Sequence, residues 1–198
     1  MNGGKFPAFS IDSVDLDFTG HFDTADLRAE LTPPIPDRGP VVSPDLLIGA
    51  GKLVENHFFV NVSRPRPKRV VDPASITVLV MEDDNTTRNI LEFMLTQERG
   101  YQVRAAGDIA GFVAAMQQKP LPDLLIFDIE FPDRISGLNI LAKVRSHAVI
   151  SDMPVIIFTM YSDPTHLSQG LALGVDAYLS KPARAGALTD VIRAVLGG

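Results

Sequence analysis

Cysteine is absent from this chain of 198 residues. Without it there are no disulfides, no thiol redox chemistry and no cysteine-based zinc sites, and such a composition is typical of a cytoplasmic protein. No run of about 18 apolar residues occurs, so we expect no membrane span. The first residues, "MNGGKFPAFSIDSVD", contain no apolar core followed by a cleavage site, and they do not have the pattern of a signal peptide.

A dense basic surface is also missing, since the net charge is −6. A nucleic-acid footprint would need a dense basic face, so we expect no nucleic-acid partner. The basic run "RPRPKR" (64–69) is short and isolated, and we interpret it as part of a linker. Internal repeats are absent as well.

Proline divides the chain into two regions, because nine of the fifteen prolines lie within residues 1–75. We expect this region to be a partly disordered, irregular N-terminal extension and linker. Two segments inside it have ordered patterns. Residues 43–56 begin with Ser-Pro, a helix-start signal, although two glycines weaken the helix. The segment "HFFVNV" (57–62) has the composition of a strand, and we hypothesise that it adds to a sheet edge or packs on the main domain.

A regular pattern begins at residue 76 and extends to 198. Apolar strands are predicted at 76–81, 101–106, 123–128, 153–160 and 176–180, each followed by a helical segment. Alternation of continuously apolar strands with helices predicts an α/β fold, with a parallel sheet covered on both faces. We therefore expect a doubly wound, flavodoxin-like five-stranded sheet in the order 2-1-3-4-5.

Acidic and basic side chains follow the predicted strands at the edge where ligands bind in this class of fold. The first strand ends in Glu82 and Asp83, and the third ends in Asp128. The fourth ends in Thr159, and the fifth is followed by Lys181. The topology therefore gathers three carboxylates, a hydroxyl and an ammonium at one place, whereas Asp84 or Asn85 fits a helix N-cap.

Such a cluster has a definite chemistry. Neighbouring carboxylates repel one another, and a divalent cation or a lysine relieves that repulsion. Oxygen ligands in a partly hydrated site suit Mg²⁺, which needs only one or two protein carboxylates. A carboxylate beside a metal and a lysine can also attack phosphorus and become an acyl phosphate. The alternative interpretation is that strand-end acids only cap helices and face water.

Four segments in order resemble the receiver domain of bacterial two-component response regulators. These are "VLVMEDDN", "LLIFDIEFPD", "VIIFTM" and "DAYLSKP", which together extend over residues 78–182. The resemblance covers about three-fifths of the chain and excludes residues 1–75.

The resemblance implies phosphoryl transfer from a sensor histidine kinase or a histidine phosphotransfer protein to Asp128. It implies a Mg²⁺ ion held by Asp83, Asp128 and the main-chain carbonyl of Glu130, with Glu82 contributing through water. Thr159 and Tyr178 would act as the switch residues, and Lys181 would contact the phosphoryl group. The Lys181–Pro182 bond is expected to be cis. A homodimer through helix 4, strand 5 and helix 5 of the receiver is a further expectation.

Some residues depart from the family pattern. One extra residue precedes Gly137 in the loop after Asp128, and Ala183 replaces an aromatic residue. Met160 stands where a small residue is usual. We hypothesise that Met160 and the Glu130 side chain alter the rate of dephosphorylation.

The expected function is that of a phosphoaccepting response regulator that signals through contacts with an unknown protein partner. We expect no DNA-binding output domain, and no enzymatic activity beyond self-catalysed phosphoryl transfer and autodephosphorylation. One alternative is a phosphorylation-independent scaffold with a receiver fold. The other is an aspartate-nucleophile phosphohydrolase, because "DIE" loosely resembles an Asp-x-Asp motif.

Overall fold

A computed structural model describes residues 18, 20–28, 44–64, 72–160, 163–182 and 185–197. Within them the helices are α1 (Thr24–Arg28), α2 (Pro44–Asn56), α3 (Asn85–Phe93), α4 (Ile109–Gln117), α5 (Gly137–Ser146), α6 (Pro164–Ala172) and α7 (Ala185–Val195). The strands are β1 (Phe58–Val60), β2 (Thr77–Met81), β3 (Gln102–Ala106), β4 (Leu124–Phe127), β5 (Val155–Thr159) and β6 (Ala177–Ser180). Short 3₁₀ turns lie at Pro73–Ser75 and Pro132–Arg134, and a π-helical turn at Met94–Glu98 extends α3.

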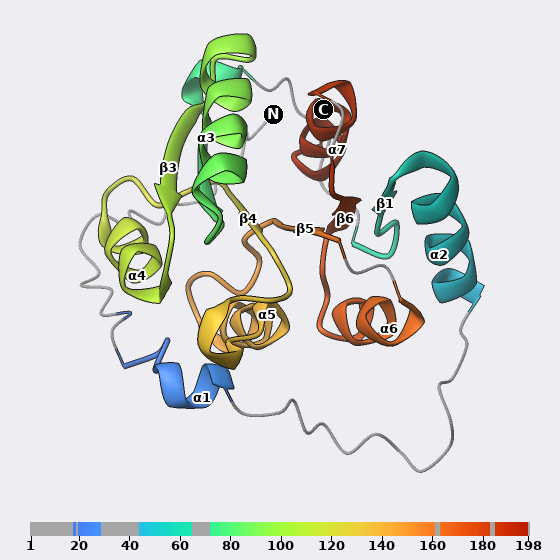
Figure 1. The fold of residues 1–198 in the computed structure, drawn as a ribbon, viewed down its shortest axis with the longest axis horizontal. Coiled ribbons are helices and arrows are strands. Elements are labelled where there is room, and N and C mark those ends of the chain that lie inside the picture. Colours follow the sequence, from blue (N-terminus) through green and yellow to red (C-terminus); the bar gives the residue numbers. More distant parts are fainter. Residues whose placement is uncertain are drawn as a thin grey trace, which may run out of the picture.

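The strands form one sheet in the order β1-β6-β5-β4-β2-β3 (Figure 1). The neighbouring pairs among β2 to β6 are all parallel, which confirms the predicted doubly wound sheet and its 2-1-3-4-5 order. Every residue of β2, β4 and β5 is buried, as expected of central strands that are covered on both faces. The carboxyl ends of β2 and β4 therefore lie side by side at one edge.

Helices cover both faces of the sheet (Figure 1). One apolar layer contains α3 and α7, whose residues pack against side chains such as Val80 and Ile126. The other contains α4, α5 and α6, which pack against side chains such as Leu79 and Phe127. Aspartates cap three of these helices: Asp84, predicted as a possible N-cap, caps α3, while Asp108 caps α4 and Asp163 caps α6. Each cap accepts hydrogen bonds from main-chain N–H groups that the helix leaves unpaired.

The sheet has one more strand than the five predicted. Strand β1 pairs antiparallel with β6, and Phe59 lies opposite Tyr178. This confirms the hypothesis that the segment 57–62 adds to the sheet edge. The helix α2 likewise matches the helical segment predicted at 43–56, whereas α1 is a regular element that the sequence did not indicate. Residues 29–43 and 65–71, which hold most of the proline-rich stretch 31–45 and of the predicted linker 63–75, lie outside the described residues.

The α2–β1 unit, residues 44–60, packs on the face formed by α6, β6 and α7 (Figure 1). Leu53 and Phe59 are buried in the same apolar cluster as Tyr178 and Leu167 of α6. Gly49 gives the Phe59 ring room, since an added Cβ would lie 3.1 Å from the ring. This is the face through which a homodimer was expected, and in this structure the chain itself covers it.

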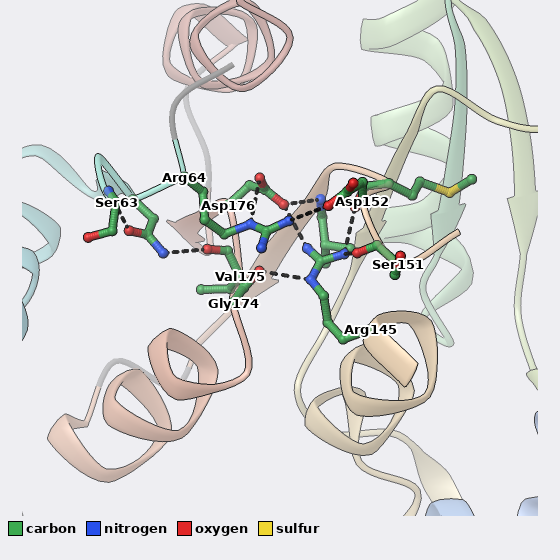
Figure 2. A network of polar contacts seen from close by, with 11 residues as sticks. Ser63, Arg64, Arg145, Ser151, Asp152, Gly174, Val175 and Asp176 are labelled. Atoms are coloured by element: carbon green, nitrogen blue, oxygen red, sulfur yellow. Dashed lines mark hydrogen bonds and ion pairs between the residues drawn. The ribbon is translucent and has the colours of Figure 1, made fainter. Parts of the chain in front are cut away.

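A polar network fixes the end of this unit to the main domain (Figure 2). The Arg64 guanidinium lies 3.4 Å from the buried carboxylate of Asp176, which also accepts a hydrogen bond of 2.8 Å from Arg145. Asn61 donates its main-chain N–H to the Asp176 carbonyl and its side-chain N–H to the Val175 carbonyl, both at 2.8 Å. Arg64, read from the sequence as part of a linker, is thus a structural residue.

The α1 segment, residues 18–28 without the undescribed Thr19, packs on α4 and α5. Phe18, Phe22 and Leu27 are almost fully buried. The Phe22 ring meets that of Phe112 in α4 edge to face, with 5.2 Å between centroids. The first described residues of the extension therefore extend the apolar core.

The first prediction concerns β1. Substitution Phe59→Ala removes a buried aromatic ring and should lower the free energy of unfolding by about 3 kcal/mol. The exposed Phe93 is the matched control, and Phe93→Ala should change the free energy by no more than about 0.5 kcal/mol. Urea unfolding followed by circular dichroism measures both variants. Equal losses in the two variants would show that β1 does not pack on β6 in solution.

Candidate functional site

The centre of the site is an ammonium group held between two carboxylates. Lys181 Nζ donates hydrogen bonds of 2.6 Å to Glu82 Oε2 and of 2.6 Å to Asp128 Oδ2. The three side chains belong to the loops after β6, β2 and β4, whose ends the parallel sheet brings together. All three are largely buried, with exposed side-chain fractions of 14% for Lys181, 3% for Glu82 and 11% for Asp128. The lysine therefore offsets the charge of both acids.

Asp128 directly follows the fully buried strand β4. Its Oδ1 accepts a hydrogen bond of 2.6 Å from the main-chain N–H of Ile129, while its Oδ2 accepts the bond from Lys181. Both oxygens are thus oriented by the protein, and the carboxylate retains a small exposed area. A carboxylate in this arrangement is positioned to act as a nucleophile.

Burial and the ion pairs shift the pKa values of Glu82 and Lys181 in opposite directions. Burial raises the pKa of Glu82, although the hydrogen bond from Lys181 lowers it in part. Burial alone would lower the pKa of Lys181, but its hydrogen bonds to Asp128 and Glu82 outweigh this effect and raise it. The lysine therefore remains a cation at neutral pH, as stabilising a transferred phosphoryl group requires.

The predicted metal ligands Asp83 and Glu130 lie in the loops after β2 and β4, beside Glu82 and Asp128 in the chain. Asp83 is exposed, next to the buried Glu82, and its side chain has no hydrogen bond or ion pair within the described chain. Glu130 pairs with Ser136 in an antiparallel bridge. That bridge uses the carbonyl of Ile129 and the N–H of Phe131, so it leaves the Glu130 carbonyl without a main-chain donor among the described residues.

This donor set fits Mg²⁺, since it offers two carboxylates and one carbonyl oxygen. Among the described residues, no group of three or more acidic or histidine side chains is arranged to hold a metal, and the predicted set does not need one. Glu82 is committed elsewhere, because Lys181 and the N–H of Asp84 occupy its two oxygens. A contribution of Glu82 to metal binding through water stays a prediction.

The two predicted switch residues lie on neighbouring strands. Thr159 ends β5, is buried, and accepts a hydrogen bond of 2.8 Å at its carbonyl from the N–H of Lys181. Tyr178 is buried in β6, and its hydroxyl donates a hydrogen bond of 2.8 Å to the carbonyl of His166 in α6. The tyrosine ring is thus in an inward position, and burial raises the pKa of its hydroxyl. The Lys181–Pro182 bond is cis, as expected.

An apolar groove of about 290 Å³ lies beside the lysine. Its lining residues come from α3 and from the ends of β5 and β6: Thr87, Ile90, Leu91, Met94, Phe158, Met160, Lys181 and Pro182. Met160 is 75% exposed and Ile90 is 53% exposed. Met160 therefore lines the approach to the site, and its effect on dephosphorylation stays a prediction.

Two features of the loop after Asp128 were not recognised from sequence. Gly137 is needed for close packing, since an added Cβ would lie 1.8 Å from the Asp128 carbonyl oxygen. Asp133 and Arg134 have positive φ angles of 60° and 61°, which accommodates the longer loop. The extra residue before Gly137 was the available signal, but a residue count does not indicate which residues adopt the unusual backbone conformation.

The parallel strands β2 to β6, with this lysine–carboxylate cluster at their carboxyl edge, define a doubly wound α/β domain. The family model "Response regulator receiver domain" matches residues 78–193, which is more than half of the chain. The chain therefore belongs to the response regulator receiver family.

The chain is also similar in sequence or structure to individual proteins. The transcriptional regulatory protein GltR of Pseudomonas aeruginosa is 35% identical over 120 residues, which cover 61% of this chain and 48% of that protein. PhoB of Escherichia coli, a phosphate regulon transcriptional regulatory protein, is 30% identical over 119 residues, covering 60% and 51%. The structure of the Vibrio cholerae chemotaxis protein CheY4 has a TM-score of 0.56 at 26% identity and covers 61% of this chain and 98% of that one.

The chain spans about half the length of the curated relatives it matches. Because these relatives are named as transcriptional regulators, they do not support the expectation that a DNA-binding output domain is absent. In the part of the chain that the structure describes, no helix has the length and apolar character needed to cross a bilayer.

The second prediction concerns the lysine. Substitution Lys181→Met leaves two buried carboxylates without their cation and should lower the free energy of unfolding at pH 8 by about 3 kcal/mol. A carboxyl with a raised folded-state pKa binds its proton more tightly in the folded state than in the unfolded state. The loss of unfolding free energy is therefore small near the ordinary pKa of 4.5 and grows as the pH rises. The difference in the free energy of unfolding between Lys181→Met and wild type should therefore be smaller at pH 5 than at pH 8.

Urea unfolding at several pH values measures this narrowing. The exposed Lys52 is the control, because Lys52→Met should change stability by no more than about 0.5 kcal/mol at any pH. A difference between Lys181→Met and wild type that does not vary with pH would contradict the proposed pairing.

The third prediction concerns Tyr178. Substitution Gly170→Ala would place a Cβ 1.8 Å from the Tyr178 hydroxyl and should force the ring out of its inward position. The pKa of that hydroxyl should then fall towards its ordinary value, which an ultraviolet titration of the tyrosines detects. Gly186→Ala in α7 meets open space and should leave the titration unchanged. An unaltered titration of Gly170→Ala would contradict the inward position.

Proposed function

We propose that this chain is a phosphoaccepting response regulator that becomes phosphorylated on Asp128. The observation that carries the proposal is the position of Lys181, whose ammonium lies 2.6 Å from the Asp128 carboxylate at the carboxyl end of the sheet. In the transfer, an Asp128 oxygen forms a bond to phosphorus, and the bond from phosphorus to the donor breaks. The proposal includes no other enzymatic activity.

Three side chains have distinct roles in this transfer. Asp128 is the nucleophile, and Lys181 offsets charge on the phosphoryl oxygens. Thr159, whose carbonyl accepts a hydrogen bond of 2.8 Å from the Lys181 main chain at the same edge of the sheet, is proposed to donate its hydroxyl to the phosphoryl group. Mg²⁺, when bound by Asp83, Asp128 and the Glu130 carbonyl, would supply additional positive charge.

The partner that supplies the phosphoryl group is proposed to be a sensor histidine kinase or a histidine phosphotransfer protein. The apolar groove beside Lys181 supports this proposal, since exposed Ile90 and Met160 flank the approach to the site. A cytoplasmic location, where such partners present their histidines, belongs to the same proposal. Met160 and Glu130 are proposed to set the lifetime of the phosphorylated state.

The output is proposed to pass through the α2–β1 unit. The residue before Lys181 is Ser180, whose N–H donates a hydrogen bond of 2.8 Å to the His57 carbonyl at the start of β1. Phe59 pairs with the switch residue Tyr178. Movement of Thr159 and Tyr178 on phosphorylation would therefore change how the α2–β1 unit packs on the main domain. This change would expose or reshape the face that the unit covers. A protein partner would bind to the altered face.

The fourth prediction tests the phosphorylation itself. With Mg²⁺ and a small acyl phosphate as donor, wild type should gain the mass of one phosphoryl group, and Asp128→Ala should gain none. The exposed Asp190 is the matched control, because Asp190→Asn should be phosphorylated like wild type. Intact-mass spectrometry measures all three proteins. No gain in wild type would favour the phosphorylation-independent scaffold, and catalytic turnover of phosphate esters would favour the phosphohydrolase.

A further inference from the structure

The loop that follows Asp128, residues 129–137, is closed upon itself. The N–H of Gly137 donates to the carbonyl of Ile129 at 2.6 Å, and the N–H of Phe131 donates to the carbonyl of Ile135 at 3.0 Å. Between these two bonds Glu130 lies directly opposite Ser136. The position of the Glu130 main chain therefore depends on the position of Ser136.

The α1 segment holds Ser136 from outside the loop. The main-chain carbonyl of Leu27 accepts a hydrogen bond of 3.2 Å from the Ser136 N–H and one of 2.8 Å from the Asn139 side chain. This carbonyl is at the end of α1, where no later turn of the helix pairs it. Without α1, the half-buried Ser136 N–H would lose this acceptor, and an unpaired donor that water reaches only in part destabilises the arrangement.

Side chains on both sides of Leu27 keep α1 in this place. The Leu27 side chain is fully buried, and Phe22 packs against Phe112 of α4. Asp26 accepts a hydrogen bond of 2.5 Å from Lys143 of α5. Arg28 lies 3.7 Å from Asp133, one of the two loop residues with positive φ. The longer loop after Asp128 therefore ends in contact with α1.

We propose that α1 is a positioning element for the phosphoacceptor loop. Docked α1 fixes Ser136, and Ser136 fixes the main chain of Glu130, whose carbonyl is a predicted ligand of Mg²⁺. This inference rests on the proposed function, because it assumes that the site binds Mg²⁺. The coupling is reciprocal: Mg²⁺ at the site should strengthen the docking of α1 to the same degree that α1 strengthens the binding of Mg²⁺.

The experiment compares the full chain with Leu27→Ala, which weakens α1 docking without changing any predicted ligand. Titration with Mg²⁺ alone, followed by the amide NMR signals of residues 129–131, should give a dissociation constant about three- to tenfold higher in Leu27→Ala. At saturating Mg²⁺, phosphorylation by an acyl phosphate should reach the wild-type extent, because the nucleophile and the lysine are unchanged.

Leu95→Ala is the matched control. Leu95 is buried in the opposite layer of the sheet, so this variant tests whether lost stability alone alters Mg²⁺ binding. The Mg²⁺ dissociation constant of Leu95→Ala should stay within about twofold of the wild-type value. This change is well below the one expected when a supporting contact is lost. The same constant in Leu27→Ala and wild type, or an equal shift in Leu95→Ala, would overturn the inference.

If Leu27→Ala does not fold, a measurement on wild type alone tests the inference. Saturating Mg²⁺ should slow amide hydrogen exchange in residues 22–28 and at Ser136, and unchanged exchange there would overturn the inference. Failure of the proposed function is recognised separately: wild type would then neither respond to Mg²⁺ nor gain a phosphoryl group, and the inference would fall with it.

Discussion

The contact between Lys181 and the two carboxylates is the interaction on which the rest of the site depends. A parallel sheet brings the ends of β2, β4 and β6 to one edge, and Glu82 and Asp128 stand there largely buried. Two buried carboxylates without a cation would strongly favour protonation. The lysine, held by hydrogen bonds of 2.6 Å to each, allows both to stay ionised where a phosphoryl group would arrive. The same contact ties three loops together, so the site's chemistry and its local stability have one physical origin.

The N-terminal extension is part of the domain at two separate places. The α2–β1 unit extends the sheet beyond β6 and covers the face beside Tyr178, anchored by Arg64 on Asp176. The α1 segment packs on α5 and binds the loop after Asp128 through the Leu27 carbonyl. One contact therefore lies near the proposed output residues and the other near Asp128, the proposed phosphoacceptor. A chain that uses both contacts can link occupancy of the site to its own extension before any partner is involved.

Much of the fold and the site could be predicted from sequence, because their signals are local. Apolar strands and capped helices define the sheet, and Asp128 and Lys181 stand at strand ends where the topology gathers ligands. The strand composition of residues 57–62 also indicated β1. The remaining contacts depend on distant residues: Phe22 and Leu27 belong to a mixed acidic segment without clear periodicity, and Arg64 lies in a basic run typical of linkers. Their burial results from tertiary packing, which no local pattern reports. The metal ligand set and the absence of an output domain stay predictions.

Phosphorylation of Asp128 is proposed to alter the α2–β1 unit through β6. Hydrogen exchange of residues 57–64, measured by mass spectrometry with and without the phosphoryl group, tests it most directly. We expect slow exchange in the unmodified protein, since β1 pairs with β6 and both Asn61 and Arg64 are hydrogen-bonded, and a clear change in rate after phosphorylation. The Asp128→Ala variant, treated with the same donor, should show no such change. Identical exchange of residues 57–64 before and after stoichiometric phosphorylation would contradict the account.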